Sequence, residues 1–105
     1  MGCRAAVGSS YNFAAGIYHR VMKAHESGDL DGAKHWQSRS LTLIDTLKIS
    51  GYMSSAKAVM EMVGVDCGPT RPPLSQITEE ERLVLRGKLE TLGFFEWLNE
   101  CTEVI

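Results

Sequence analysis

All three prolines of this 105-residue chain fall in one short stretch, and the remaining sequence is free to form helices. Pro69, Pro72 and Pro73 lie within residues 65–77, together with Gly68. Proline removes a backbone donor and disfavours helix in the residue before it. We therefore expect an extended loop over residues 65–77, with helices before and after it.

The first helix is expected to start at Phe13, because apolar residues recur at helical spacing from that point. Phe13, Ile17 and Val21 follow one another every four residues and share one face. Asn12 is a suitable N-cap for this helix. Gly28 is well placed to end it in a left-handed turn.

Two more helices are expected before the proline-containing loop. One runs from about Leu30 to Ser50, with Asp29 as its cap and Gly51 at its end. A shorter one covers residues 56–63 and stops at Gly64. Their apolar stripes are Ala33, Trp36, Leu43, Ile44 and Leu47 in the longer helix and Ala56, Val59, Met60 and Val63 in the shorter one.

The last helix has the clearest start signal in the chain. Residues 78–81 read Thr-Glu-Glu-Glu, which matches the capping box, where the hydroxyl and the third carboxylate each bond a free amide. Leu85, Leu89 and Leu92 form the inner stripe, and Gly93 closes the helix.

Both ends of the chain are harder to assign. Residues 5–10 are short and apolar, and periodicity does not decide between a buried strand and a lead-in. After Gly93, an apolar patch of Phe94, Phe95, Trp97 and Leu98 needs cover. The sequence predicts a mainly α fold: a bundle of about four helices in a single domain over residues 1–105.

Charge and cysteine content limit the classes of partner. The net charge is -2, from 11 basic and 13 acidic side chains without a basic patch, so we expect no nucleic-acid partner. No apolar run reaches the roughly 20 residues of a membrane span, and the N-terminus does not resemble a secretion signal. Cys3, Cys67 and Cys101 are few and widely spaced, which is typical of reduced thiols in a cytoplasmic protein.

The residue types that often carry chemistry do not converge in the sequence. His19, His25 and His35 lack metal-ligand spacing and are interpreted as structural histidines. Cys67 has no predictable base beside it. Lys57 is interpreted as an ordinary helix lysine rather than a Schiff-base amine. We predict no catalytic residue, cofactor or metal from these patterns.

Three stretches in one order carry a family resemblance. Residues 1–12, ending in Gly-Ser-Ser-Tyr-Asn, resemble a strand of the form M-G-A-x-G-A-V-G-S-T-Y-N. Residues 28–37 resemble a helix–helix junction, and residues 57–74 resemble K-A-x-M followed by G-P-x-R-x-P-L. The chain thus resembles the C-terminal region of the N-acetylneuraminate lyase/dihydrodipicolinate synthase family, leaning toward the lyase branch.

The resemblance implies a fold and a chemistry. Family members are class I aldolases on a (β/α)8 barrel, followed by appended helices. They form a Schiff base between a barrel lysine and a 2-keto acid, usually pyruvate, with help from a tyrosine and a carboxylate-binding loop. Those elements precede the matched region. Residues 1–12 then correspond to the last barrel strand and its loop, residues 13–28 to the last barrel helix, and residues 29–98 to the appended helices.

The resemblance also selects a candidate substrate-facing segment. The carboxyl end of a barrel strand faces the active site, so Ser9, Ser10, Tyr11 and Asn12 are expected nearest the substrate in an intact relative. Tyr11 is the preferred pocket-lining residue. Arg4 departs from the small residues usual at this position.

Three functional hypotheses follow. In the first, the chain is a C-terminal part of such a lyase, inactive alone and structural or oligomerising. In the second, it is a stand-alone helical protein–protein interaction module. In either case we expect apolar helix faces, Phe94, Phe95 and Trp97 among them, to be covered by self-association or by a barrel-forming partner chain. A small enzyme with a new site is a third reading, which lacks convergent titratable residues.

Overall fold

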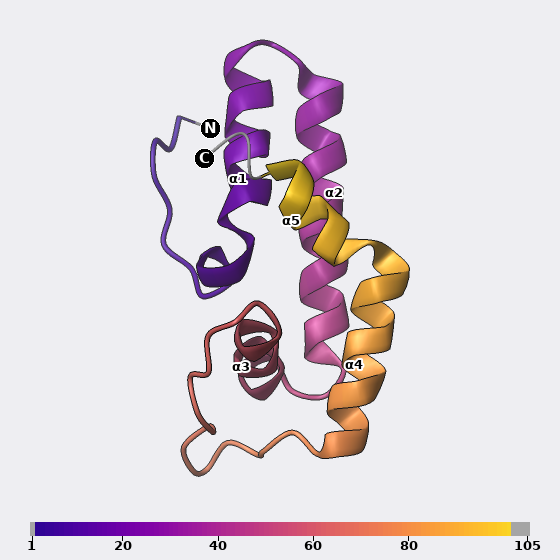
Figure 1. The fold of residues 1–105 in the computed structure, drawn as a ribbon. Coiled ribbons are helices and arrows are strands. Elements are labelled where there is room, and N and C mark those ends of the chain that lie inside the picture. The colour runs from indigo at the N-terminus through magenta and orange to yellow at the C-terminus, as the bar shows by residue number, and fades with distance from the viewer. Residues whose placement is uncertain (1, 102–105) are drawn as a thin grey trace.

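The computed structural model describes residues 2–101, which form five α-helices and no strand. The helices are α1 (Tyr11–Glu26), α2 (Leu30–Lys48), α3 (Tyr52–Met62), α4 (Glu79–Leu92) and α5 (Phe94–Cys101). Figure 1 shows α1 and α2 as an antiparallel pair, with α4 along the lower part of α2. α5 packs across the pair, and α3 lies below α1. The mainly α prediction is confirmed.

The prediction of about four helices was wrong by one, because the apolar C-terminal patch forms a helix of its own. Gly93 adopts the left-handed conformation (φ 85°) and ends α4 as predicted. The Trp97 amide then donates to the Gly93 carbonyl at 2.9 Å, which begins α5. Phe94 and Trp97 are buried within this chain, and Phe95 is partly buried.

The segment before α1 does not form the strand that the resemblance suggests. Residues 2–8 have no regular secondary structure and are exposed. A strand needs a neighbour for its backbone N–H and C=O groups, and no segment of residues 2–101 supplies one. Residues 2–8 therefore form no strand because they have no neighbouring strand to pair with among residues 2–101.

Several of the predicted helix ends are confirmed by their hydrogen bonds. The Asp29 carboxylate accepts from the Gly32 amide at 2.9 Å. Thr78 and Glu81 form the reciprocal capping box, with both bonds at 3.1 Å. Gly28 has a φ of +81°, which supports the left-handed turn after α1.

The core joins helices from both halves of the chain. Its fully buried large apolar side chains are Ile17, Leu43, Leu47, Val59, Leu89 and Phe94. The Phe13 and Phe94 rings meet edge-on with centroids 6.5 Å apart, so the first and last helices share this core. Val63 is an exception among the predicted stripes, because α3 ends at Met62 and Val63 is exposed.

The proline-containing loop is confirmed over residues 65–77, which contain no helix or strand. Thr70 is buried and anchors the loop, because its hydroxyl donates to the Ser75 carbonyl at 3.1 Å. The Gln76 side chain bonds the Thr70 backbone as both donor and acceptor. These bonds satisfy polar groups that a buried loop would otherwise leave unpaired.

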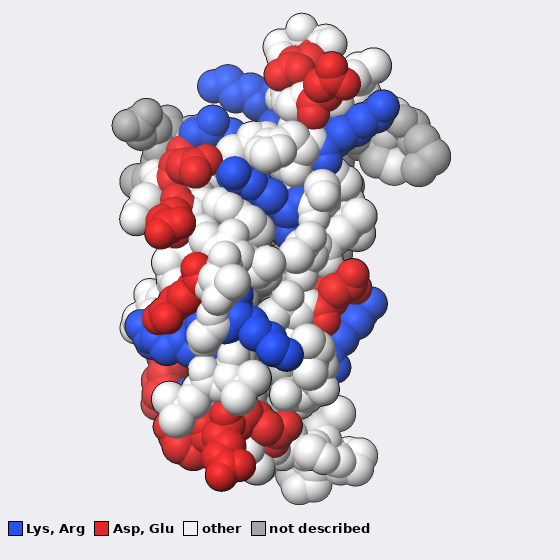
Figure 2. Space-filling view, turned by 90° about the vertical axis from the view of Figure 1, so that its right-hand side faces the viewer, with Lys and Arg blue, Asp and Glu red and all other residues white. Residues whose placement is uncertain are grey.

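Charged side chains of both signs are interspersed over the face shown in Figure 2. Acidic atoms gather at its lower end, where α4 begins with Glu79, Glu80 and Glu81. Within the described part of the chain, no helix is both long and apolar enough to cross a membrane.

Candidate functional site

The segment proposed to face substrate lies at the start of α1. The assignment of Asn12 as N-cap was wrong, because α1 begins at Tyr11 and Ser10 takes the cap position. The Asn12 side-chain amide instead donates to the Ser9 carbonyl at 2.9 Å. Ala14 has non-helical backbone angles (φ -131°, ψ 21°), so the first turn is kinked relative to the rest of α1.

Ser10 is connected to α2 by hydroxyl groups, through Tyr18 and Ser40. The Ser10 Oγ and Tyr18 Oη atoms are 2.8 Å apart. The Ser40 hydroxyl, from α2, donates to the same Tyr18 oxygen at 2.8 Å. Both serines are buried, with 6% and 1% of their surface exposed. Ser10 therefore faces the helices.

Ser9 has a separate partner on α3. Its Oγ atom lies 2.8 Å from Tyr52 Oη, and this bond is exposed to solvent. Adjacent serines are thus connected to different helices, Ser10 through Tyr18 to α2 and Ser9 to the start of α3.

Tyr11 lies against Tyr18 and lines a cavity. The two rings meet edge-on, with centroids 4.5 Å apart and planes at 73°. The cavity has a volume of about 320 Å³ and lies between the N-terminal segment and α1. Its other lining residues are Cys3, Arg4, Ala5, Ala6, Ala15, Tyr18, His19, Val21 and Met22. The cavity wall is mainly apolar, and Tyr11 is one of its polar groups.

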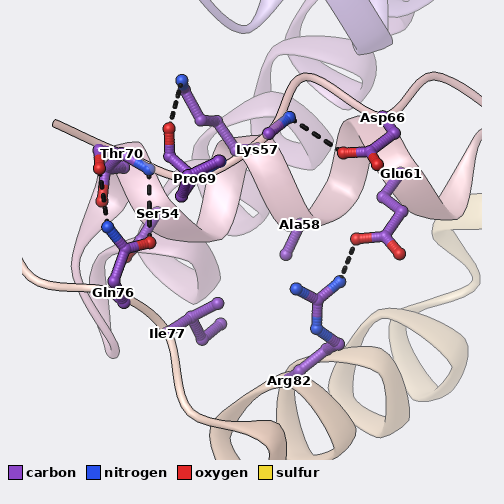
Figure 3. Close-up of a pocket in the computed structure, with 11 residues that line it drawn as sticks. Ser54, Lys57, Ala58, Glu61, Asp66, Pro69, Thr70, Gln76, Ile77 and Arg82 are labelled. Carbon is purple, nitrogen blue, oxygen red and sulfur yellow. Dashed lines mark hydrogen bonds and ion pairs between the residues drawn. The ribbon is translucent and has the colours of Figure 1, made fainter.

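A second cavity, of about 260 Å³, lies between α3, the proline-containing loop and the start of α4 (Figure 3). The Lys57 amine donates to the Pro69 carbonyl at 3.0 Å, and Arg82 forms an ion pair with Glu61. Asp66 accepts from the Gly68 amide at 2.8 Å. The charged groups of this cavity bond to neighbouring groups of the chain. These bonds connect the proline-containing loop to α3 and α3 to α4.

These contacts agree with the structural interpretation of Lys57. The side chain is half-buried on α3 and uses its amine to hold the loop backbone. A Schiff-base lysine needs a free amine that a carbonyl carbon can approach. In this structure the Lys57 amine instead donates a hydrogen bond to the Pro69 carbonyl.

The three histidines and Cys101 lie in different environments. His19, His25 and His35 are all exposed. Among residues 2–101, no group of three or more His, Cys, Asp and Glu side chains is arranged to hold a metal ion. Cys101 is buried, and burial raises the pKa of its thiol although the nearby Arg20 opposes the shift.

One cluster was missed by sequence reasoning. The Arg39 guanidinium lies over the Trp36 ring at 4.5 Å and over the Trp97 ring at 5.0 Å. It also forms an ion pair with Glu100 at 3.2 Å. Arg20 approaches Trp36 from α1 at 5.3 Å and donates to the Glu100 carbonyl. The sequence contains only a weak signal for this cluster. Trp36 and Arg39 are three residues apart on an expected helix, but Trp97 is distant from both in the sequence.

With this geometry in place, comparisons with known proteins decide the family. Residues 1–92 match the model of the dihydrodipicolinate synthetase family. The chain belongs to this family. The resemblance read from the sequence is confirmed.

Several known proteins match nearly the whole chain. N-acetylneuraminate lyase of Mus musculus is 35% identical over 96 residues, covering 90% of this chain and 30% of that protein. An uncharacterized DapA-like lyase of Halobacterium salinarum is 31% identical over 93 residues, covering 89% of this chain and 31% of that protein. The solved structure of Proteus mirabilis N-acetylneuraminate lyase matches with a TM-score of 0.82 and 30% identity, covering 89% of this chain and 32% of that one.

The chain therefore spans about a third of the length of these relatives. The part that matches the family contains Ser9, Ser10, Tyr11 and Asn12 and all of α1–α4. Both hydroxyl connections, through Tyr18 and through Tyr52, thus lie inside the region of family similarity.

Proposed function

We propose that this chain is the C-terminal part of an N-acetylneuraminate lyase-like, pyruvate-dependent aldolase, structural or oligomerising in role and inactive by itself. The observation that carries the proposal is the match to the Proteus mirabilis lyase. It has a TM-score of 0.82 over 89% of this chain, yet involves only 32% of that protein. By family resemblance, the Schiff-base lysine, its assisting tyrosine and the carboxylate-binding loop belong to the barrel that precedes the matched region.

The exposed N-terminal segment supports this role. Residues 2–8 form no strand and pair with no strand among residues 2–101, and Val7 is fully exposed. In a (β/α)8 barrel each strand pairs on both sides and its inward side chains fill the barrel core. A barrel-forming chain would supply the pairing and the cover that residues 2–8 lack here.

Apolar surface on the helices supports a structural or oligomerising role. A groove of about 390 Å³ runs between α1 and α2. Leu30 and Leu41 line it and are more than half exposed. Contact with a barrel or with a second copy of the chain would remove this apolar surface from water.

We also propose that the protein is located in the cytoplasm. The support for this proposal is that Cys3 and Cys67 are free and exposed.

The alternative is a stand-alone helical interaction module, and one observation favours it. The helices bury a core of their own, with Ile17, Leu43 and Phe94 fully inaccessible. Such a core lets the chain keep its fold without a barrel, and its apolar groove could then bind another protein.

Fragment complementation tests the proposal. The chain is mixed with the barrel part of the Mus musculus lyase that lacks the matched C-terminal region, and pyruvate release from N-acetylneuraminate is measured. We expect no release from the chain alone and release from the mixture. Val7→Asp should abolish the effect by placing a charge in the barrel strand, whereas the matched Val7→Ile should retain it.

The outcomes separate the two hypotheses. Pyruvate release by the chain alone would contradict inactivity. A mixture without release, and without co-elution in gel filtration, would contradict the lyase role and favour the interaction module.

A further inference from the structure

The hydroxyl connections at the start of α1 link the candidate substrate-facing segment to the helices behind it. We infer that Tyr18, Ser40 and Tyr52 are positioning residues, which set the side chains of Ser9 and Tyr11 at the site of the lyase. This inference rests on the proposed function and adds to it. It gives the appended helices a part in shaping the site in addition to packing against the barrel.

The buried part of this network joins three hydroxyl groups. Ser40 donates to Tyr18 Oη, and a phenol can both accept and donate. Tyr18 Oη lies 2.8 Å from Ser10 Oγ, and either of these two hydroxyls can donate to the other. Because Ser10 and Ser40 are both buried, neither hydroxyl can exchange its partner for bulk water without cost.

The network acts on Tyr11 at two points. Ser10 immediately precedes Tyr11, so anchoring the Ser10 side chain restrains the backbone that carries Tyr11. The Tyr18 ring also packs edge-on against the Tyr11 ring, with centroids 4.5 Å apart. One residue on α1 thus restrains both the main chain and the side chain of the candidate pocket tyrosine.

The kink at Ala14 explains why such restraint matters. Its non-helical angles (φ -131°, ψ 21°) interrupt α1 directly after the first turn. A turn that is not continuous with its helix is less restrained by the regular hydrogen-bond ladder. The position of Tyr11 therefore depends more on its ring contact with Tyr18 and on the bonds that hold the preceding Ser9 and Ser10.

The bond between Ser9 and Tyr52 is the weaker of the two connections. It joins residues 43 positions apart and is exposed, so water competes with it. It still places the Ser9 hydroxyl on the α3 side of the segment. We therefore expect Tyr52 to contribute less than Tyr18.

Hydrogen exchange on the isolated chain provides the first test. Tyr18→Phe keeps the ring beside Tyr11 and removes the hydroxyl that joins Ser40 to Ser10. The amides of Tyr11, Asn12 and Phe13 should then exchange about tenfold faster, while amides within α4 keep their rates. Tyr11→Phe is the matched control and should leave these rates unchanged, since the Tyr11 hydroxyl has no hydrogen-bond partner among residues 2–101.

Catalysis in the complemented lyase provides the second test. Tyr18→Phe and Ser40→Ala should each lower kcat/KM about tenfold, and the double variant should be no worse than either, because both changes break one chain. Additive losses would indicate two unrelated effects and overturn the inference.

The two readouts also separate this inference from the proposed function. Unchanged amide exchange in Tyr18→Phe overturns the inference whatever the assay shows. An unmodified chain that fails to complement the barrel overturns the proposed function and this inference with it. Full complementation with unchanged kcat/KM in Tyr18→Phe overturns the inference alone.

Discussion

Arg39 and Glu100 form an ion pair at 3.2 Å that joins α2 to α5 across 61 positions of sequence. The same guanidinium lies over the rings of Trp36 and Trp97. This one side chain therefore connects the second helix to the last helix by charge and by stacking. It holds in place the helix that supplies Phe94 to the core.

Replacing Arg39 should destabilise the fold more than replacing its acidic partner. Arg39→Ala removes both ring contacts and the ion pair, and we expect a loss of about 2 kcal/mol in the free energy of unfolding. Glu100→Gln removes a half-exposed charge and should cost less than about 1 kcal/mol. Urea denaturation measures both. Equal losses would show that the ring contacts contribute nothing.

The capping box at the start of α4 should be visible in stability. Thr78→Ala removes the hydroxyl that accepts from the Glu81 amide, and should cost about 1 kcal/mol. Thr78→Ser keeps the hydroxyl and is the matched control. Thermal unfolding followed by circular dichroism compares the two, and an equal melting temperature for both variants would contradict the role of the cap.

Stability should depend on pH through Glu81. Its bonds to the Thr78 amide and hydroxyl lower the pKa of this carboxyl below its usual 4.5. Because the folded state has the lower pKa, the contribution is complete above pH 4.5 and is lost as the pH falls through the folded-state value. The stability difference between the unmodified chain and Glu81→Gln should therefore shrink as the pH falls through the folded-state pKa of Glu81. A difference that grows on acidification would refute the sign.

Glycine substitutions should separate backbone strain from crowding. Gly28 and Gly93 both have positive φ, but a Cβ at Gly28 meets nothing within 4 Å, whereas one at Gly93 lies 3.1 Å from a Glu96 oxygen. Gly28→Ala should cost about 1 kcal/mol, and Gly93→Ala should cost more. Gly87→Ala, in the interior of α4 with open space, should stabilise by about 0.5–1 kcal/mol. Chemical denaturation of the three variants would show whether this order holds.

Thiol reactivity should distinguish the three cysteines. Cys3 and Cys67 are exposed, whereas Cys101 is buried and burial raises its pKa, which disfavours the reactive thiolate. At pH 8 the folded chain should react rapidly at Cys3 and Cys67, and the third thiol should react after denaturation. Cys101→Ser should leave the rapid phase unchanged. Rapid reaction of all three thiols in the folded chain would contradict the burial.

Borohydride trapping with pyruvate tests the assignment of Lys57. Its amine bonds the Pro69 carbonyl and fastens the proline-containing loop to α3. We expect no labelled adduct at Lys57, with Lys57→Gln as the background control. Mass spectrometry that finds a stable adduct on this residue would revive a catalytic role for it.

Local signals in the sequence determined the parts of the fold that depend on adjacent backbone atoms. The Asp29 cap, the Thr78 capping box and the left-handed end at Gly93 each involve residues within one helical turn. The loop at residues 65–77 followed from the covalent restriction of proline. The order of motifs in the first 74 residues was sufficient for the family.

The tertiary structure alone decided which distant side chains meet. Trp97 and Arg39, or Ser9 and Tyr52, are brought together by the rotation and crossing of helices, which no local pattern specifies. The sequence suggested residues 9–12 as a candidate segment, which stays a prediction, and it did not indicate the connection of this segment through Tyr18 to Ser40. Capping depends on neighbours in the chain, whereas a hydroxyl network or an arginine between two rings exists only once packed helices place its parts within bonding distance.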